Sequence, residues 1–244
     1  MLNDFLLGLI NLITSALTAI TGVGGGMILI GFMPFFLPSI AIIPVHGITQ
    51  LASNASRAWF RRRDIIWQPF KQFVIGSILG MVLFGVLIRF VKLDLIPLFI
   101  GIYILLLQWS AIFNRLIRRF ESFFLVGFLQ TGLGVFVGTP GPLNIAVLNK
   151  HYTDTHQVVT TGALMMTVVH GAKILVYVTL GFAFLDYWRL LIFMVVMATV
   201  GSWIGTKLRH QFSANWLKKI LPYLLILLAL KLIVAIMIEQ GFFA

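Results

Sequence analysis

Apolar runs follow one another along almost the whole chain of 244 residues, and this feature limits the possible folds more than any other. About 20 apolar residues allow a helix to span a bilayer, and in lipid only helices and closed barrels satisfy their own backbone hydrogen bonds. Only 10% of the residues are charged, against about 25% in a soluble domain, so a water-soluble fold is excluded. We predict an all-α, polytopic helical membrane protein. Its apolar helices are expected at 5–20, 27–43, 46–60, 69–90, 95–113, 121–137, 155–181, 187–207 and 214–238.

Two clusters of glycine and proline, at 22–26 and 138–142, interrupt these runs. Such clusters break helices, and a break within a membrane must be buried in protein or line a cavity. When the two breaks are superimposed, several other positions also align, in the same order. They are Gly22 with Gly138, Asn54 with His170, Arg57 with Lys173, and, after an insertion, Gly76 with Gly201 and Gly80 with Gly205. We therefore predict two repeats within one membrane domain, at 1–120 and 121–244, each beginning with a glycine-broken helix pair.

The basic residues predict how the two repeats are oriented. Most of them lie in three connecting stretches, 61–71, 115–119 and 207–219, which the positive-inside rule places in the cytoplasm. The spacing of Gly76 with Gly80 and of Gly201 with Gly205 suits close helix packing, so we call the two helices that carry these glycines the small-residue helices. The basic stretch precedes the small-residue helix in the first half and follows it in the second. Equivalent helices should therefore run in opposite directions, which is an inverted-topology repeat with both termini on the outer side. The alternative is an up-and-down bundle in which the glycines only mark loops.

The net charge of +11 is thereby explained mainly by topology, and it does not indicate a nucleic-acid partner. All seven acidic residues fall at the ends of predicted segments. Cation pumps and proton relays usually carry a carboxylate within the membrane, so this distribution argues against a cation substrate. The polar residues within the predicted spans are neutral or basic.

Two pairs of polar residues share a helix face because each pair is three residues apart: His170 with Lys173, and Asn54 with Arg57. A lysine near the centre of a span costs at least about 2.5–3.5 kcal/mol to insert. An anionic ligand is one candidate for offsetting this cost, and a hydrated cavity or a neutral lysine is another. If the pairs meet across a pseudo-two-fold axis, they form a polar, net-positive site near the midplane.

The glycine-rich breaks could add backbone donors to that site, because the first N–H groups of a helix are free and carry a partial positive charge. Glycines there let an anion approach closely; their alternative role is tight helix crossing. His46 is a further candidate near the first break, with a cap or core role as its alternative. The candidate substrate-binding residues are Lys173, His170, Asn54, Arg57, Gly24, Gly25, Gly26, Thr139, Gly141 and His46. No spacing typical of a metal site, cofactor motif or catalytic motif is found, so neither an enzyme nor a cofactor is predicted.

These motifs resemble those of the TauE/SafE family of sulfite exporters. The resemblance is carried by 22–26, Pro34, Asn54 and 61–65 in the first half, and by 138–142, Gly201 and Gly205 in the second. In the second half the chain departs from the family, because Thr139, Pro140 and Pro142 replace a fully glycine-rich turn. The resemblance implies a multi-pass protein of the bacterial inner membrane that transports sulfite, organosulfonates or related small oxyanions, usually as an exporter.

Residues and resemblance together favour a secondary transporter whose two repeats alternate access to a central anion site. Its expected partners are a small anionic substrate and the lipid bilayer, and the sequence leaves homo-oligomerisation open. The alternative functions are a small-anion channel with the same charge arrangement, or a membrane assembly subunit that transports nothing. Direction, ion coupling and the identity of the anion are not encoded in any visible motif.

Overall fold

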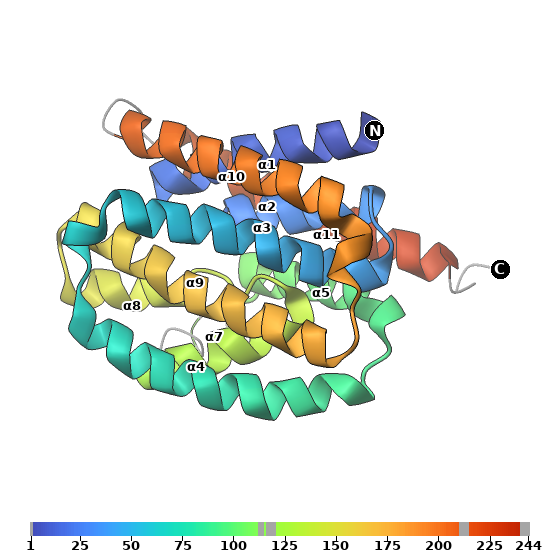
Figure 1. Cartoon of the computed structure of the whole chain (residues 1–244), viewed down its shortest axis with the longest axis horizontal. Coiled ribbons are helices and arrows are strands. Elements are labelled where there is room, and N and C mark those ends of the chain that lie inside the picture. The colour runs from blue at the N-terminus through green and yellow to red at the C-terminus, as the bar shows by residue number, and fades with distance from the viewer. Residues whose placement is uncertain (1, 112–114, 116–120, 210–214, 240–244) are drawn as a thin grey trace.

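The computed structural model describes residues 2–111, 115, 121–209 and 215–239. Every regular element in these ranges is a helix, so the predicted all-α fold is confirmed (Figure 1). The first half contains α1 (Leu2–Thr21), α2 (Gly25–Phe32), α3 (Ser39–Phe60), α4 (Trp67–Leu87) and α5 (Ile96–Trp109). The second half contains α7 (Phe123–Val137), α8 (Leu143–His151), α9 (Thr155–Thr179), α10 (Trp188–Leu208) and α11 (Asn215–Glu239). Short 3-10 helices are η1 (Met33–Phe35), η2 (Arg62–Asp64), η3 (Ile88–Phe90), η4 (Leu93–Leu95) and η5 (Phe184–Tyr187).

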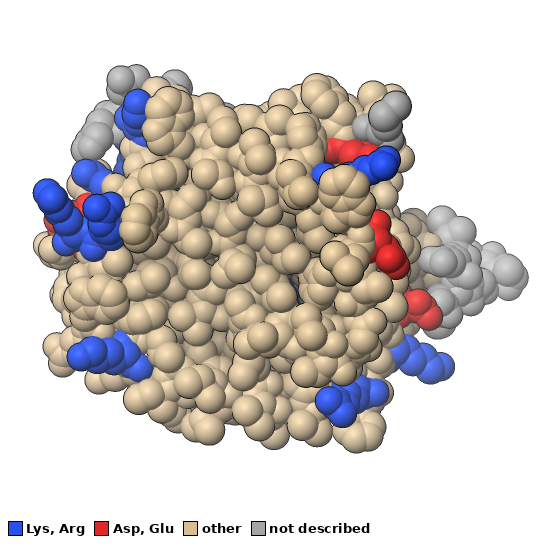
Figure 2. Space-filling model, viewed as in Figure 1, with Lys and Arg blue, Asp and Glu red and all other residues tan. Residues whose placement is uncertain are grey.

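Five of the described helical segments are long and apolar enough to cross a membrane: Leu2–Thr21, Trp67–Phe90, Thr155–Thr179, Phe184–Leu208 and Lys219–Met237. The middle of the face seen in Figure 2 shows no charged side chain, and the charged side chains gather at the two ends of the bundle. Many large apolar side chains of the described helices are exposed, among them Ile75, Leu79 and Val82 of α4. Exposed apolar side chains on this scale need lipid as their solvent. The protein is therefore a multi-pass membrane protein, as predicted.

Helix α3 is long but does not qualify as an apolar span, because polar side chains occupy its buried face. Together with α9, which runs antiparallel to it, α3 forms the centre of the bundle (Figure 1). The opposed directions follow from two contacts. Arg61 at the end of α3 meets His156 at the start of α9, whereas Gly47 lies against Lys173 farther along α9. The two predicted pairs of polar residues are thus carried by neighbouring helices.

The boundary expected between 27–43 and 46–60 is wrong. Helix α2 ends at Phe32, and α3 begins at Ser39 and continues through Pro44. Pro38 has an extended backbone with ψ of 150° and stands at the N-cap, so it separates the two helices. Pro44 lacks one backbone donor but remains inside α3. His46 is consequently an interior residue of α3, and it does not begin a helix.

Glycines spaced four apart allow two pairs of helices to touch through their backbones. A Cβ atom at Gly201 would lie 2.2 Å from the Leu12 carbonyl oxygen, and one at Gly205 would lie 2.2 Å from the Ala16 carbonyl oxygen. These contacts join α10 to α1. The predicted close packing is present, and no side chain larger than hydrogen fits at these positions.

The same arrangement joins α4 to α7 in a second pair. A Cβ atom at Gly76 would lie 1.9 Å from the Phe124 carbonyl oxygen, and one at Gly80 would lie 2.4 Å from that of Phe128. Residue numbers rise together along both pairs, so each pair is parallel. The small-residue helix of each half therefore packs against the first helix of the other half. The division into two repeats and the inverted orientation of the two halves stay predictions.

Candidate functional site

The two glycine breaks have similar backbone geometry. Gly22 and Gly24 have φ of 85° and 99° in the first break, and Gly138 and Gly141 have φ of 72° and 76° in the second. Residues other than glycine rarely adopt these positive φ values, so glycine allows the chain to turn back at each break without strain. Each turn joins a longer helix to a shorter one, α1 to α2 and α7 to α8.

The second break is the tip of a closed hairpin. Lys150 at the end of α8 forms an exposed ion pair of 2.8 Å with Glu121, which precedes α7. The two ends of the hairpin therefore lie together at one end of the bundle. The hydrogen bond and the charge of Lys150 lower the pKa of the Glu121 carboxyl below its usual value. The break itself thereby reaches into the protein, next to α9.

A pocket of about 510 Å³, including its opening, lies between the two breaks. Its walls come from both halves of the chain: the end of α1, the first break, α3, the second break, α8 and α9. Its lining residues are Thr18, Gly22, Val23, Gly24, Gly26, Met27, Gln50, Asn54, Arg57, Thr139, Gly141, Pro142, Asn144, Ile145, Gly162, Ala163, Met166 and His170.

Arg57 supplies a buried cation to this pocket and is only 2% exposed. Its Nη2 donates a hydrogen bond to Asn54 Oδ1, and Asn54 Nδ2 donates to the Gln50 carbonyl oxygen at 2.8 Å. The amide of Asn54 is thereby fixed with its oxygen toward the guanidinium. Arg57 Nε and Nη1 are buried and have no hydrogen-bond partner in the described ranges of the chain. A buried guanidinium with unpaired donors is costly, and an anion in the pocket would lower that cost.

His170 adds a second basic side chain to the pocket wall. It is 2% exposed, and its buried Nδ1 has no hydrogen-bond partner within the described part of the chain. Its ring packs edge-on against that of His46, with centroids 5.7 Å apart. His170 and Arg57 come from α9 and α3, so each of the two central helices contributes a basic side chain to the pocket. That these side chains together bind an anion stays a prediction.

Lys173 lies behind the pocket and does not line it. Its fully buried Nζ donates to the Gly138 carbonyl oxygen at 2.9 Å and to His46 Nδ1 at 3.1 Å. Since His46 Nδ1 accepts, its Nε2 carries the hydrogen and donates to the Gly26 carbonyl oxygen at 3.0 Å. A continuous chain of hydrogen bonds therefore connects the second glycine break to the first. Lys173 Nζ therefore has two polar partners, and neither of these described partners is a carboxylate.

The structure brings most of the sequence-predicted site residues to the pocket. Those that line it are Gly24, Gly26, Asn54, Arg57, Thr139, Gly141 and His170. Lys173 and His46 lie in the hydrogen-bond chain behind it. Gly25 packs against α1, where a Cβ atom would lie 1.9 Å from the Thr14 carbonyl oxygen, so its role in the structure is close packing.

Three polar residues of the lining were not among the predicted site residues: Thr18, Gln50 and Asn144. Asn144 Nδ2 donates to the Gly162 carbonyl oxygen at 2.9 Å, and Asn144 Oδ1 faces Gln130 Nε2 at 3.4 Å. The position of Asn144 directly after the second break was a usable signal. Thr18 and Gln50 gave no comparable signal, because the face of a helix that meets a pocket depends on its neighbours.

A protein-family model described as sulfite exporter TauE/SafE matches residues 7–232 of the chain. The matched range contains both glycine breaks and every residue that lines the pocket. Comparison with curated proteins and with solved structures finds no match to the chain.

Proposed function

Because the chain belongs to the TauE/SafE sulfite exporter family, we propose that it is a secondary transporter that exports small sulfur-containing anions, such as sulfite or organosulfonates. The membrane in question is the bacterial inner membrane, with the basic loops in the cytoplasm and both termini outside. The anion binds in the pocket between the two glycine breaks.

The observation that carries this proposal is the state of Arg57. Its guanidinium is buried at a pocket wall, keeps two nitrogens without partners, and contacts no carboxylate among the described residues. A guanidinium offers N–H groups in a planar fork that matches the oxygens of an oxyanion, and such charge-assisted hydrogen bonds are strong. A sulfite or sulfonate group would occupy the free donors of Arg57.

The other pocket residues would complete the site. Asn54 holds the guanidinium in place through its oxygen, and His170 offers a ring nitrogen from the opposite helix. The first turn of α2 has backbone N–H groups without intrahelical partners, and Gly24 and Gly26, which line the pocket, would let an anion come near them. Lys173 supports the site from behind through the carbonyl of Gly138.

Transport would proceed by alternating access. The pocket is walled by both halves, so a rocking of one half against the other would expose it first to one side and then to the other. Helices α3 and α9 meet at the centre, and each carries part of the site. Their relative movement would change the distance between Arg57 and His170.

The proposal is tested by flux in proteoliposomes, with sulfite, sulfoacetate, taurine, sulfate and simple carboxylates as substrates. Hydrogen bonds to a charged group contribute about 1.5–3 kcal/mol, so Arg57→Gln should lower kcat/KM for sulfite by about 10–150-fold. Arg57→Lys keeps the charge without the fork and should fall between the two. Lys231→Gln serves as the matched control, because Lys231 is exposed and lies over the Phe35 ring, away from the pocket.

Saturable sulfite flux that survives unchanged in Arg57→Gln would contradict the site. Wild-type protein that moves none of these anions would contradict the function, and an assembly subunit would then be indicated by a stable partner on purification. Single-channel currents far above carrier turnover would instead favour the anion channel.

A further inference from the structure

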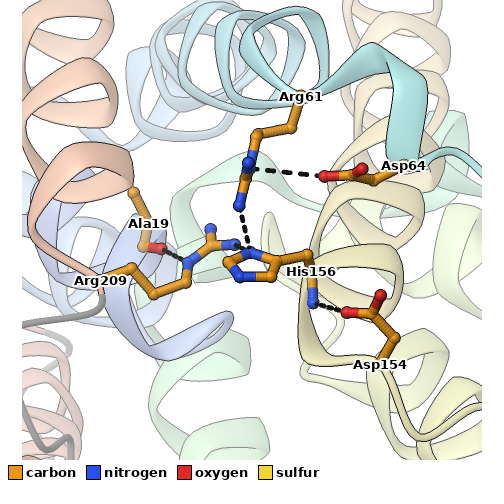
Figure 3. Close-up of polar contacts among 6 residues, drawn as sticks. All are labelled: Ala19, Arg61, Asp64, Asp154, His156 and Arg209. Carbon is orange, nitrogen blue, oxygen red and sulfur yellow. Dashed lines mark hydrogen bonds and ion pairs between the residues drawn. The ribbon is translucent and has the colours of Figure 1, made fainter.

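A second group of basic side chains converges at the end of the bundle where α3 ends and α9 begins (Figure 3). Arg61 Nη2 lies 2.7 Å from His156 Nδ1, and Arg209 Nη1 lies 3.5 Å from the same nitrogen. The two arginines come from the ends of α3 and α10, and the histidine comes from the first turn of α9. We call Arg61 and Arg209 the arginine pair.

The arginine pair has less negative charge around it than two guanidiniums need. Arg61 is within 3.4 Å of Asp64, whereas Arg209 hydrogen-bonds to the Ala19 carbonyl oxygen at 2.7 Å and to the shared imidazole. Arg209 Nη2 is buried and has no hydrogen-bond partner among the residues that the structure describes. Burial and the charge of Arg61 lower the pKa of Arg209 to about 10, while Asp64 opposes that change. The site is therefore short of one acceptor and of negative charge.

The arginine pair adjoins the pocket that holds Arg57. Arg57 and Arg61 are four residues apart at the end of α3, so both lie on one face of that helix. The Ala19 carbonyl that accepts from Arg209 neighbours Thr18, which lines the pocket. Arg209 is also near enough to Arg57 for their charges to repel. Three guanidiniums thus lead from the end of the bundle to the pocket.

We propose that Arg61 and Arg209 form a second anion-binding station, which receives a small oxyanion between the solvent and Arg57. The station takes the same chemical class as the pocket, a sulfite or sulfonate group whose oxygens bridge two guanidiniums, and this inference rests on the proposed function. One bridging anion would supply the acceptor that Arg209 Nη2 lacks and would offset the excess positive charge.

His156 keeps the station assembled when no anion is bound. Its Nδ1 accepts from both guanidiniums, so that nitrogen carries no hydrogen. The Asp154 side chain accepts from the backbone N–H of His156 at 2.7 Å and caps the start of α9. A neutral nitrogen is a weaker partner for two cations than an anionic oxygen, so an arriving oxyanion would displace it.

A station of this kind raises the rate at which anions reach the pocket. Positive charge at the mouth of a site increases the association rate, and salt screens this effect over about 8 Å at 0.15 M. Loss of one guanidinium should therefore act mainly on KM and should weaken as ionic strength rises. A purely structural role would lower the amount of folded protein and would not depend on salt in this way.

The first experiment measures sulfite flux in proteoliposomes for Arg209→Gln, Arg209→Lys and wild type at low and high ionic strength. We expect KM to rise about tenfold or more in Arg209→Gln at low salt, for the loss of a charge-assisted partner of about 1.5 kcal/mol. We expect kcat to stay within about twofold of the wild-type value, because the substitution should leave the turnover step unchanged. The KM of Arg209→Lys should lie between those of Arg209→Gln and wild type. The melting temperature of each variant without anion shows whether it is folded.

Arg62→Gln is the matched control, because Arg62 is exposed and lies over the Trp59 ring. It removes one positive charge from the same end of the bundle without touching the arginine pair. Its KM should stay near that of wild type. An equal rise of KM in Arg62→Gln would overturn the station and leave only a general surface charge effect.

The second experiment uses the absence of cysteine from the chain. Arg209→Cys provides a single thiol, which a cationic methanethiosulfonate reagent converts into a positively charged side chain. Sulfoacetate should slow the reaction at that thiol. The positively charged product should lower KM part of the way back to the wild-type value. The reaction is measured in vesicles of neutral lipid and in vesicles that contain phosphatidylglycerol. The comparison shows whether the transported anion or a lipid headgroup occupies the station.

Protection by phosphatidylglycerol and not by sulfoacetate would overturn the station, as would an unchanged KM in Arg209→Gln. In either case, a loss of sulfite flux in Arg57→Gln would still support the proposed function. A wild-type protein without any anion flux overturns both proposals together.

Discussion

The hydrogen-bond chain from Gly138 through Lys173 and His46 to Gly26 predicts a measurable coupling between two side chains. His46→Leu removes the imidazole that accepts from Lys173 Nζ at 3.1 Å and donates to the Gly26 carbonyl at 3.0 Å. The ammonium of Lys173 is then left fully buried, with the Gly138 carbonyl as its remaining hydrogen-bond partner among the described residues. Leucine fills most of the volume, so the cavity term is small.

The magnitude follows from the two lost bonds. A hydrogen bond to a charged group contributes about 1.5–3 kcal/mol, and an orphaned buried carbonyl costs about 1–3 kcal/mol. His46→Leu should therefore destabilise the wild-type protein by about 2.5–6 kcal/mol, the sum of these two ranges. In a Lys173→Met background the ammonium is gone, and His46→Leu should cost only the carbonyl, about 1–3 kcal/mol. The expected coupling energy is about 1.5–3 kcal/mol.

The assay is reversible unfolding in mixed detergent micelles for wild type, both single variants and the double variant. A parallel cycle that pairs His46→Leu with Lys231→Met is the control, because Lys231 is exposed and far along α11. That cycle should be additive within about 0.5 kcal/mol. If the His46 and Lys173 cycle is additive within the same margin, the reasoning that ties the two glycine breaks together is refuted.

Three further outcomes are expected. Gly25→Ala places a Cβ atom 1.9 Å from the Thr14 carbonyl oxygen, so it should lower stability by about 1–3 kcal/mol, seen as a lower melting temperature; an unchanged value would contradict the packing. Gly201→Leu should prevent α10 from meeting α1 and should abolish the monodisperse peak in gel filtration. Lys150 lowers the pKa of Glu121, so this contribution to stability is present above the unfolded value of 4.5 and is lost as pH falls through the lower folded value. The melting temperature of Glu121→Gln, measured as a function of pH, should lack that acid dependence. A pH profile identical to that of wild type would contradict the ion pair.

Local sequence patterns predicted much of the fold because they act within single elements. The apolar runs indicated helices, and the glycine clusters indicated both breaks, because positive φ values such as that of Gly24 have a local cause. The boundary near Pro44 could not be predicted in this way. Both Pro38 and Pro44 can mark a helix boundary, but only Pro38 does so, as the N-cap of α3, and Pro44 stays inside that helix.

The candidate site was predicted as a set of residues but not in its arrangement. Helical spacing placed Arg57 beside Asn54 and His170 beside Lys173, and these neighbours are local. The spacing of Gly201 and Gly205 announced close packing, yet their partner, α1 of the other half, depends on the path of the whole chain. Likewise, the meeting of Arg61 and Arg209 joins residues from opposite halves.

The sequence by itself determined that this is an all-α membrane protein with two glycine breaks and a family resemblance that the comparison confirms. It also made Lys173 a candidate anion ligand, because a lysine within a span is costly and every acidic residue falls at a segment end. Only the tertiary structure decided that Lys173 has polar partners already, while Arg57 keeps unpaired donors at a pocket. The partner that makes the difference is the carbonyl oxygen of Gly138. Every residue carries a carbonyl oxygen, so no sequence pattern predicts that this one will bind Lys173. It becomes the partner of Lys173 only when folding brings the second break against α9.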